Sequence, residues 1–299
     1  MTVAEQAVHP AAHGPAVTNS VKKRRTALQK AGRVLLWLWL LATMFPLLFM
    51  VLTSIKPAGI AKQIPPVWIF TPTFDNYTQA LAGGSGTSVG FSRLLMNSAI
   101  ITLGSVALTL VLAIPAAYAL SLRNFRQRKG FSSWILSTYM FPPILSVIPI
   151  FIFAGKLNLI DTYPVLIIPY ASFNLPIAVW ILRSTILQIP YEIQEAAMVD
   201  GASRWVVLRR IILPVLVPAI ATAAILSAIL VWNEFLFALS LTRAAAKTSP
   251  VGIQEFTGMF GTDWGLLTAA STIIVLPIVI LTLILRRRIV SGLTFGAVK

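Results

Sequence analysis

The chain has no cysteine, which excludes disulfides, thiolate metal sites and cysteine catalysis. Histidine is nearly absent as well: His9 and His13 lie near the N-terminus with Pro10 between them, and no helix is indicated there to align them on a metal. We therefore predict no metal site. Charged residues make up only 11% of the chain and hydrophobic residues 57%, whereas a soluble domain carries about 25% charged residues. So few charges indicate a protein surrounded by lipid.

Acidic residues are few, with nine Asp and Glu against 24 Lys and Arg, and the net charge of +15 raises the question of nucleic-acid binding. The basic residues, however, form short clusters between long apolar runs, with no basic stripe beside an aromatic platform. Enrichment of Lys and Arg in the cytoplasmic loops of a membrane protein explains this pattern better. We expect a lipid bilayer, and no nucleic acid, among the partners.

Six apolar runs are long enough for the roughly 20 helical residues that cross a hydrocarbon core of about 30 Å. They cover residues 34–55, 94–122, 131–154, 163–186, 212–241 and 265–285. Because the runs are continuous, they favour helices over a β-barrel, which needs alternating segments of about ten residues. The sequence therefore predicts an all-α membrane protein with six transmembrane helices.

Charge orients these helices. With the N-terminus inside, 18 of the 24 Lys and Arg lie in the cytoplasmic segments, so both termini are predicted to be cytoplasmic. Residues 1–33 are predicted to be a basic, disordered cytoplasmic tail. Residues 34–299 form the membrane domain, which ends in a cytoplasmic tail over residues 286–299.

Prolines are concentrated in the third and fourth runs, at Pro142, Pro143, Pro149, Pro164, Pro169 and Pro176. Each removes a backbone donor and can kink or break a helix. Broken membrane helices are tolerated where other protein or a water-filled path satisfies the freed groups. Two interpretations are consistent with this pattern: the prolines form kinks that serve packing, or these two spans line the moving part of a transport pathway.

The cytoplasmic segment at about residues 190–214 holds three of the nine acidic residues. Glu192 and Glu195 fall in the first turns of a short amphipathic helix, where negative charge complements the helix dipole. Asp200 and Gly201 give a turn signal where that helix should end. A helix lying on lipid headgroups would instead carry Lys and Arg beside its apolar face. The charge of this helix therefore favours docking to a protein partner.

This segment also carries a resemblance. Glu195-Ala196-Ala197, three residues, Gly201, nine residues, Ile211, one residue and Leu213-Pro214 match the EAA loop of binding-protein-dependent ABC importer permeases. Four further segments resemble carbohydrate permeases of the type of the maltose transporter's second membrane subunit. They are residues 74–77, Asn97-Ser98, 232–239 and 292–299. The resemblance covers about residues 34–299 and implies the type I ABC importer permease fold.

What the resemblance implies is a multi-pass permease subunit in a bacterial or archaeal inner membrane, without catalytic activity of its own. ATP and Mg would be bound by two nucleotide-binding subunits, and this chain has no Gly-x-x-x-x-Gly-Lys-Ser/Thr phosphate loop. We expect no cofactor in the chain itself. The other partners implied are a second, homologous permease subunit, giving a heterodimer, and an extracytoplasmic sugar-binding protein. The residues that would couple to the ATPase are Glu195, Ala196, Ala197, Asp200, Gly201, Ile211, Leu213 and Pro214.

The implied cargo is a sugar, with a di- or oligosaccharide similar to trehalose or maltose favoured. Sugar sites combine hydrogen-bonding groups with aromatic faces, and the span residues of this kind are Tyr139, Tyr170, Asn174, Trp232, Asn233 and Glu234. Packing is the competing interpretation of each. The alternatives are a permease for glycerol-3-phosphate or another polyol and an ion-driven secondary transporter, for which Glu234 would be the only carboxylate well inside a span. An intramembrane enzyme would need a nucleophile and base that the spans lack.

Overall fold

The computed structural model describes residues 16–83, 89–122, 126–258 and 261–294, and side chains within residues 29–83, 89–122, 126–257 and 261–284. It divides into two compact units, Met1–Leu52 and Thr53–Lys299, which are described separately. His9 and His13, and the last five residues of the predicted C-terminal tail, lie outside the described residues.

The first unit consists of helix α1 (Ala16–Ser54), whose last two residues belong to the second unit. The helix begins directly after Pro15, so residues 16–33, predicted to be disordered, are helical. The physical reason is that no proline interrupts the chain between Pro15 and Pro46. Large apolar side chains from Val34 to Leu52 are exposed on all sides, as expected of a helix surrounded by lipid.

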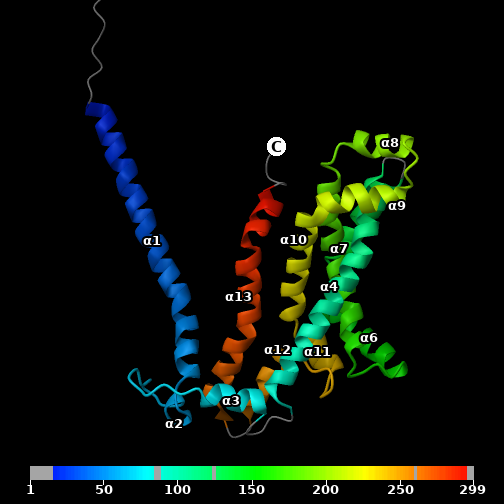
Figure 1. Cartoon of the computed structure of the whole chain (residues 1–299). Helices are drawn as coiled ribbons and strands as arrows, with labels where there is room; N and C mark the ends of the chain where they lie inside the picture. Colours follow the sequence, from blue (N-terminus) through cyan, green and yellow to red (C-terminus); the bar gives the residue numbers. More distant parts are fainter. Residues whose placement is uncertain (1–15, 84–88, 123–125, 259–260, 295–299) are drawn as a thin grey trace, which may run out of the picture. The chain divides into compact units, whose positions relative to one another are not determined.

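Four long helices form the body of the second unit: α4 (Phe91–Ser121), α7 (Tyr163–Ile186), α10 (Leu213–Trp232) and α13 (Trp264–Thr294). Helices α4, α7 and α10 pack against one another, and α13 packs against α10 (Figure 1). Small buried residues, among them Ala113, Ala117 and Ala178, allow close packing between α4 and α7.

Shorter elements connect these helices or cover their ends. They are α2 (Ala58–Ala61), α3 (Asp75–Ala82), α5 (Arg128–Thr138), α6 (Ile144–Lys156), α8 (Tyr191–Val199), α9 (Arg204–Val207), the π-helical turn η1 (Leu208–Ile212), α11 (Leu236–Leu241), α12 (Ser249–Gly252) and the 3-10 turn η2 (Ile253–Phe256). The strands β1 (Thr257–Gly258) and β2 (Gly261–Thr262) pair antiparallel, with Thr257 opposite Thr262.

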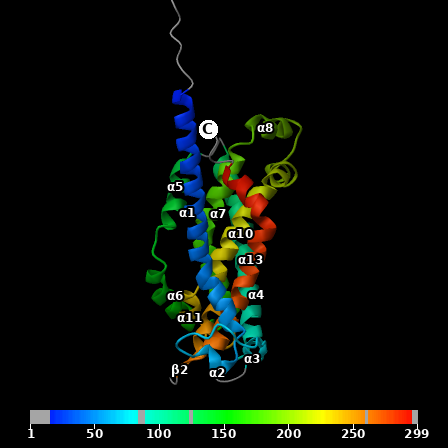
Figure 2. The same ribbon diagram turned by 90° about the vertical axis from the view of Figure 1, so that its left-hand side faces the viewer.

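The third predicted span is not one continuous helix. It is divided into α5 and α6, which lie one above the other along the bundle (Figure 2). The break contains Pro142 and Pro143, which remove two backbone donors and disfavour helix in the preceding residue. The fifth predicted span also ends early, because α10 stops at Trp232 and α11 starts only at Leu236.

Within the described residues, five helical segments are long and apolar enough to cross a membrane. They are Gln29–Ser54, Phe91–Ser121, Tyr163–Ile186, Arg204–Trp232 and Trp264–Ile284. The chain is thus a multi-pass helical membrane protein, and the one predicted span that is not among these five is the third, which corresponds to the pair α5 and α6.

Candidate functional sites

A tight turn at the end of α8 shapes the predicted EAA loop. The Asp200 N–H donates to the Ala196 carbonyl (3.0 Å) and the Gly201 N–H to that of Met198 (3.1 Å). Gly201 has a φ of +86°, the left-handed region that favours glycine. A Cβ atom there would meet nothing within 4 Å. Backbone conformation, and not lack of space, is therefore what requires glycine at this position.

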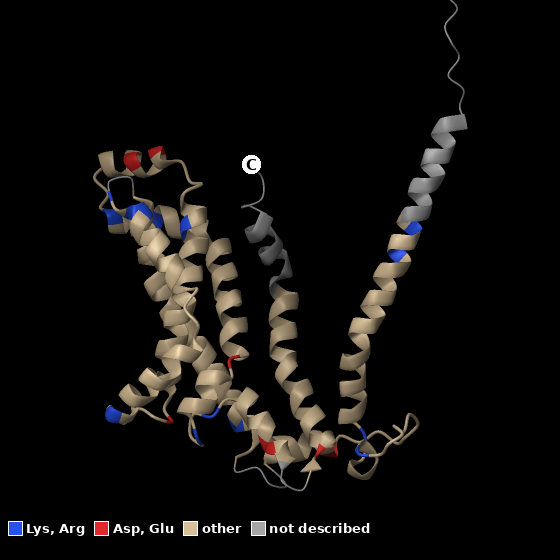
Figure 3. Cartoon of the chain, turned by 180° about the vertical axis from the view of Figure 1, so that it is seen from behind, with Lys and Arg blue, Asp and Glu red and all other residues tan. Residues whose placement is uncertain are grey.

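Helix α8 has one face on the protein and one face exposed. Ala197 and Met198 pack against the buried cluster formed by α4, α7 and α10. Glu195 and Ala196 are exposed, and the Glu195 carboxylate has no hydrogen-bond or ion-pair partner among the described residues. Figure 3 shows acidic residues of α8 at the end of the unit where several Lys and Arg also gather. The exposed face thus presents negative charge and small side chains.

The second half of the EAA loop leads into α10 without a break. Ser203 accepts from the Val206 N–H (3.4 Å) and caps the first turn of α9, a role that the sequence analysis missed. The side chains of Ile211 and Leu213 pack against the same buried cluster. Pro214 is the second residue of α10, directly after the π-helical turn η1. These residues join the loop rigidly to the helix that follows.

A cavity of about 370 Å³ lies between α7, α10 and the break that separates α5 from α6. This volume falls in the usual range of small-molecule sites, about 300–1,000 Å³. Four of the six predicted pathway residues line it: Tyr139, Tyr170, Asn174 and Glu234. Aromatic rings surround these polar groups, contributed by Phe141, Phe173 and Phe237. Hydrogen-bonding groups and aromatic faces therefore meet in one place.

Glu234 satisfies backbone N–H groups at the break between α10 and α11. Its carboxylate accepts from the N–H groups of Phe237 (3.0 Å) and Ala238 (3.3 Å), and from the Tyr170 hydroxyl. The Asn174 amide donates to the Tyr170 carbonyl (2.8 Å), while its buried oxygen has no hydrogen-bond partner within the described residues.

The other two predicted pathway residues lie outside the cavity. The Trp232 Nε1 donates to the Ile274 carbonyl of α13 (3.0 Å) and so joins two helices. The Asn233 amide donates back to the Ile229 carbonyl of its own helix (2.8 Å). The structure thus separates these neighbours from Glu234, although all three are adjacent in sequence.

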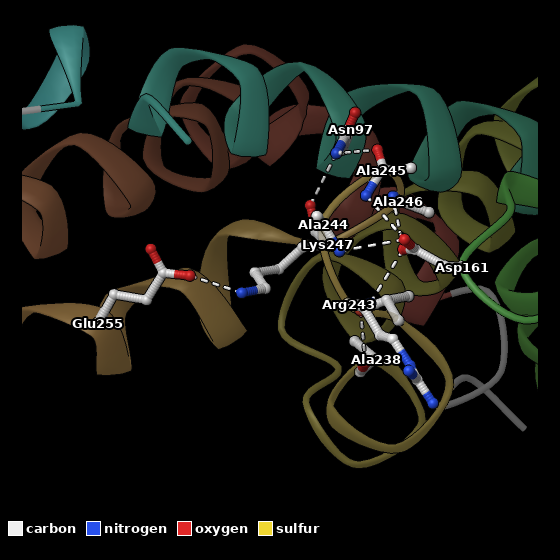
Figure 4. A network of polar contacts seen from close by, with 10 residues as sticks. Asn97, Asp161, Ala238, Arg243, Ala244, Ala245, Ala246, Lys247 and Glu255 are labelled. Carbon is white, nitrogen blue, oxygen red and sulfur yellow. Dashed lines mark hydrogen bonds and ion pairs between the residues drawn. The ribbon is translucent and has the colours of Figure 1, made fainter. Parts of the chain in front are cut away.

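A polar network beside α11 and α12, at the opposite end of the unit from α8 (Figure 1), was not predicted as a site. Figure 4 shows it from close by. The Asp161 carboxylate accepts four backbone N–H groups, those of residues 243, 244, 245 and 246, at 2.9–3.1 Å. Asp161 itself has a φ of +63°, which Asp tolerates better than most residues. An Asp between two apolar runs was the one sequence signal that could have pointed to it.

Asn97 completes this network from the start of α4. Its amide donates to the carbonyls of Ala245 and Lys247 (both 2.9 Å) and its oxygen accepts from the Tyr163 hydroxyl (2.9 Å). The next residue, Ser98, accepts from the Ser249 N–H (2.9 Å). The segment after α11 is therefore held by side chains from two separate parts of the chain, Asn97–Ser98 and Asp161.

Burial opposes ionisation of Asp161, yet the four backbone N–H donors outweigh it and lower the pKa to about 2 from the ordinary value of 3.8. The folded-state pKa thus lies below the unfolded one. The stabilisation by the charged carboxylate is fully present above pH 4 and is lost as the pH falls from about 4 to about 2.

Residues 109–294 match the family described as "Binding-protein-dependent transport system inner membrane component". The trehalose transport system permease protein SugB of Mycobacterium tuberculosis is 39% identical over 262 residues, which cover 86% of this chain and 92% of that protein. The trehalose/maltose transport system permease protein MalG of Thermococcus litoralis is 39% identical over 260 residues, 86% of this chain and 91% of that protein.

The fold is also similar to that of solved transporters. A chain from the crystal structure of a bacterial ABC transporter that imports the acidic polysaccharide alginate has a TM-score of 0.73 at 24% identity. The match covers 88% of this chain and 96% of that one.

Replacing Asp161 with Asn keeps the size of the side chain but removes the charge and leaves one acceptor oxygen for four donors. We expect the amides of residues 243–246 to lose about tenfold in protection from hydrogen–deuterium exchange, in line with the loss of hydrogen bonds to a charged group. In the unchanged protein, protection should be higher at pH 6 than at pH 3. Asp75→Asn, at the start of α3, is the control and should change nothing in this segment. Equal protection in all three proteins would contradict the role given to Asp161.

Proposed function

Because this chain belongs to the family of binding-protein-dependent transport system inner membrane components, we propose that it forms half of the translocation pathway of a sugar importer. A second, homologous permease subunit supplies the other half, and ATP is hydrolysed by separate nucleotide-binding subunits. The relatives named for trehalose and for trehalose/maltose favour a disaccharide of this kind as cargo.

The observation that carries the coupling proposal is the exposed face of α8. It combines the Glu195 carboxylate, which has no partner among the described residues, with Ala196 and the half-exposed Ile193. Trp205 on α9 and Val199 are 65% and 87% exposed. Apolar side chains that are exposed at this polar end of the unit are typical of the core of a protein interface. Their position suits the groove of a nucleotide-binding subunit.

The cavity around Tyr170 and Glu234 supports a neutral sugar as the cargo. Its polar groups can accept and donate hydrogen bonds to hydroxyls, and its rings suit the C–H faces of a sugar. No Lys or Arg is among the described residues that line it, so the cavity offers no cation to a phosphate. This disfavours glycerol-3-phosphate.

Glu234 fits a structural and binding role better than ion coupling. Two backbone N–H groups and the Tyr170 hydroxyl already occupy its carboxylate. Ion-driven transporters use carboxylates or histidines within spans as ion sites, and the sequence offers no second one there.

The segment from Thr242 to Trp264 is the proposed contact for the extracytoplasmic binding protein. Asp161 and Asn97 hold the backbone of residues 243–247 in place. The ion pair between Lys247 and Glu255 (2.5 Å) joins two parts of the same segment. A pre-ordered loop loses less conformational entropy when a partner binds.

Reversing the charge at Glu195 should uncouple the subunit from its ATPase. We expect Glu195→Arg to reduce recovery of the nucleotide-binding subunit in affinity purification at least tenfold and to abolish sugar uptake, because a charge pair with a basic groove residue becomes a repulsion. The control is Asp75→Arg, the same charge reversal at an exposed residue of α3, which should leave both unchanged. Normal recovery and uptake for Glu195→Arg would show that α8 is not the docking helix.

The cavity is tested by removing one hydroxyl. Tyr170→Phe keeps the ring but loses the donor to Glu234, and we expect sugar uptake at fixed concentration to fall about three- to tenfold, the range for one hydrogen bond. Asn233→Ala is the matched control, since that amide bonds only within its own helix. The cavity assignment fails if Asn233→Ala reduces uptake as much as Tyr170→Phe, with both proteins present in the membrane at normal levels.

A further inference from the structure

A second cavity, of about 280 Å³, lies where α7 ends, α8 begins and α5 starts. It is called the basic cavity here, and three of its lining side chains are Arg128, Lys129 and Arg183. The predicted orientation of the chain puts it at the cytoplasmic surface of the membrane. It is distinct from the cavity around Glu234, which shares none of its lining residues.

Backbone carbonyls at the end of α4 hold the two arginines. Arg183 Nε donates to the Leu120 carbonyl (3.2 Å) and Arg128 Nη1 to that of Leu122 (3.4 Å). Each bond uses one of the five N–H donors of a guanidinium group. The remaining donors belong to side chains that line the cavity and are partly withdrawn from water.

A buried amide lines the same cavity. Gln194 of α8 is only 4% exposed, and its side chain has no hydrogen-bond partner among the described residues. The polar atoms of this amide are not among those that are fully buried without a hydrogen-bond partner, so the amide reaches the cavity. A bound molecule that carries acceptor oxygens would accept a hydrogen bond from this amide and would meet the arginines at the same time.

No carboxylate offsets the charge inside the cavity. Its described lining contains three cationic side chains and no Asp or Glu. Glu192 and Glu195 are exposed on α8 and are not among the residues that line it. Crowded like charges that are half-buried are unfavourable alone and favour an anion between them.

Apolar surface beside the charges favours a lipid over a soluble anion. Ile186 and Leu187 also line the basic cavity, and Leu187 is 51% exposed. A separate hollow of about 430 Å³ on α5 is lined by Phe131 and Trp134. A headgroup phosphate in the basic cavity would thus have apolar surface nearby for an acyl chain. Basic cavities between membrane helices on the cytoplasmic side are suited to anionic headgroups.

We propose that the basic cavity binds the headgroup phosphate of an anionic phospholipid from the cytoplasmic leaflet. Arg128, Arg183 and Lys129 neutralise the phosphate, and the Gln194 amide donates to one of its oxygens. Because Gln194 belongs to α8, the bound lipid fixes the start of the proposed coupling helix to the membrane surface. The inference does not depend on which sugar is transported.

Lipid binding can be measured directly by native mass spectrometry of the full-length chain purified with its partner subunits. Phosphatidylglycerol and phosphatidylcholine are titrated in parallel, with inorganic phosphate as a third arm. We expect one phosphatidylglycerol to bind tightly and phosphatidylcholine not to bind comparably. Inorganic phosphate should not displace the phosphatidylglycerol. Displacement of the lipid by millimolar inorganic phosphate would overturn the lipid assignment and identify a site for a soluble phosphate.

Substitutions locate the bound lipid. Arg128→Gln and Lys129→Gln should each weaken phosphatidylglycerol binding about fivefold, the expected share of one basic residue at a membrane surface. Lys129 is exposed and no hydrogen bond ties it to the fold, so its substitution should not impair folding. The matched control is Arg126→Gln, an exposed arginine of the same segment that is not among the cavity residues. Equal binding by the Arg126, Arg128 and Lys129 variants would overturn the proposal.

Discussion

A backbone N–H or C=O inside a bilayer has no water to bond with, so the protein itself must satisfy it wherever a membrane helix breaks. This chain does so with a few polar side chains. Glu234 covers the N–H groups at the start of α11, and Asp161 covers those of the segment that follows. Asn76 donates to the carbonyls of Ser54 and Lys56 at the end of α1. The break at Glu234 is also where the candidate sugar cavity lies.

The coincidence has a physical reason. A continuous apolar helix presents only side chains to its surroundings, whereas a break exposes polar groups that can bind solutes or partners. Each covering side chain also ties together segments that are distant in sequence, as Asn97 does with the segment after α11. A structure held in this way can keep a polar cavity in lipid while side chains satisfy backbone groups at the break.

The EAA loop and the cavity are connected by one helical segment. From Arg204 to Trp232 the chain runs through α9, η1 and α10 as a single apolar span, roughly 40 Å long at 1.5 Å per residue. Its first end adjoins α8, and its last residues precede Glu234 and the cavity. A continuous helical segment of this kind would carry a displacement of α8 to the cavity. The π-helical turn η1 is the one part of it where the helical geometry can change.

Sequence patterns predicted what depends on local composition. The apolar runs located the long helices, and the EAA spacing identified the loop whose turn requires Gly201. The family assignment confirmed the importer permease, and Tyr170, Asn174 and Glu234 do meet in one cavity. Side-chain direction at a break was not predictable, because Trp232 and Asn233 point away from their neighbour Glu234. The role of Asp161 depends on backbone groups about eighty residues away, which no local pattern reveals.

The central claim, that α8 drives a change at the cavity through α10, can be tested with thiol labelling, since the chain has no native cysteine. Tyr139→Cys places a reporter on the cavity at a residue that is 46% exposed. In the assembled transporter, trapping ATP should change its labelling rate by a membrane-impermeant maleimide, and the added Glu195→Arg substitution should abolish that change. An ATP-dependent change that persists with Glu195→Arg would contradict the account.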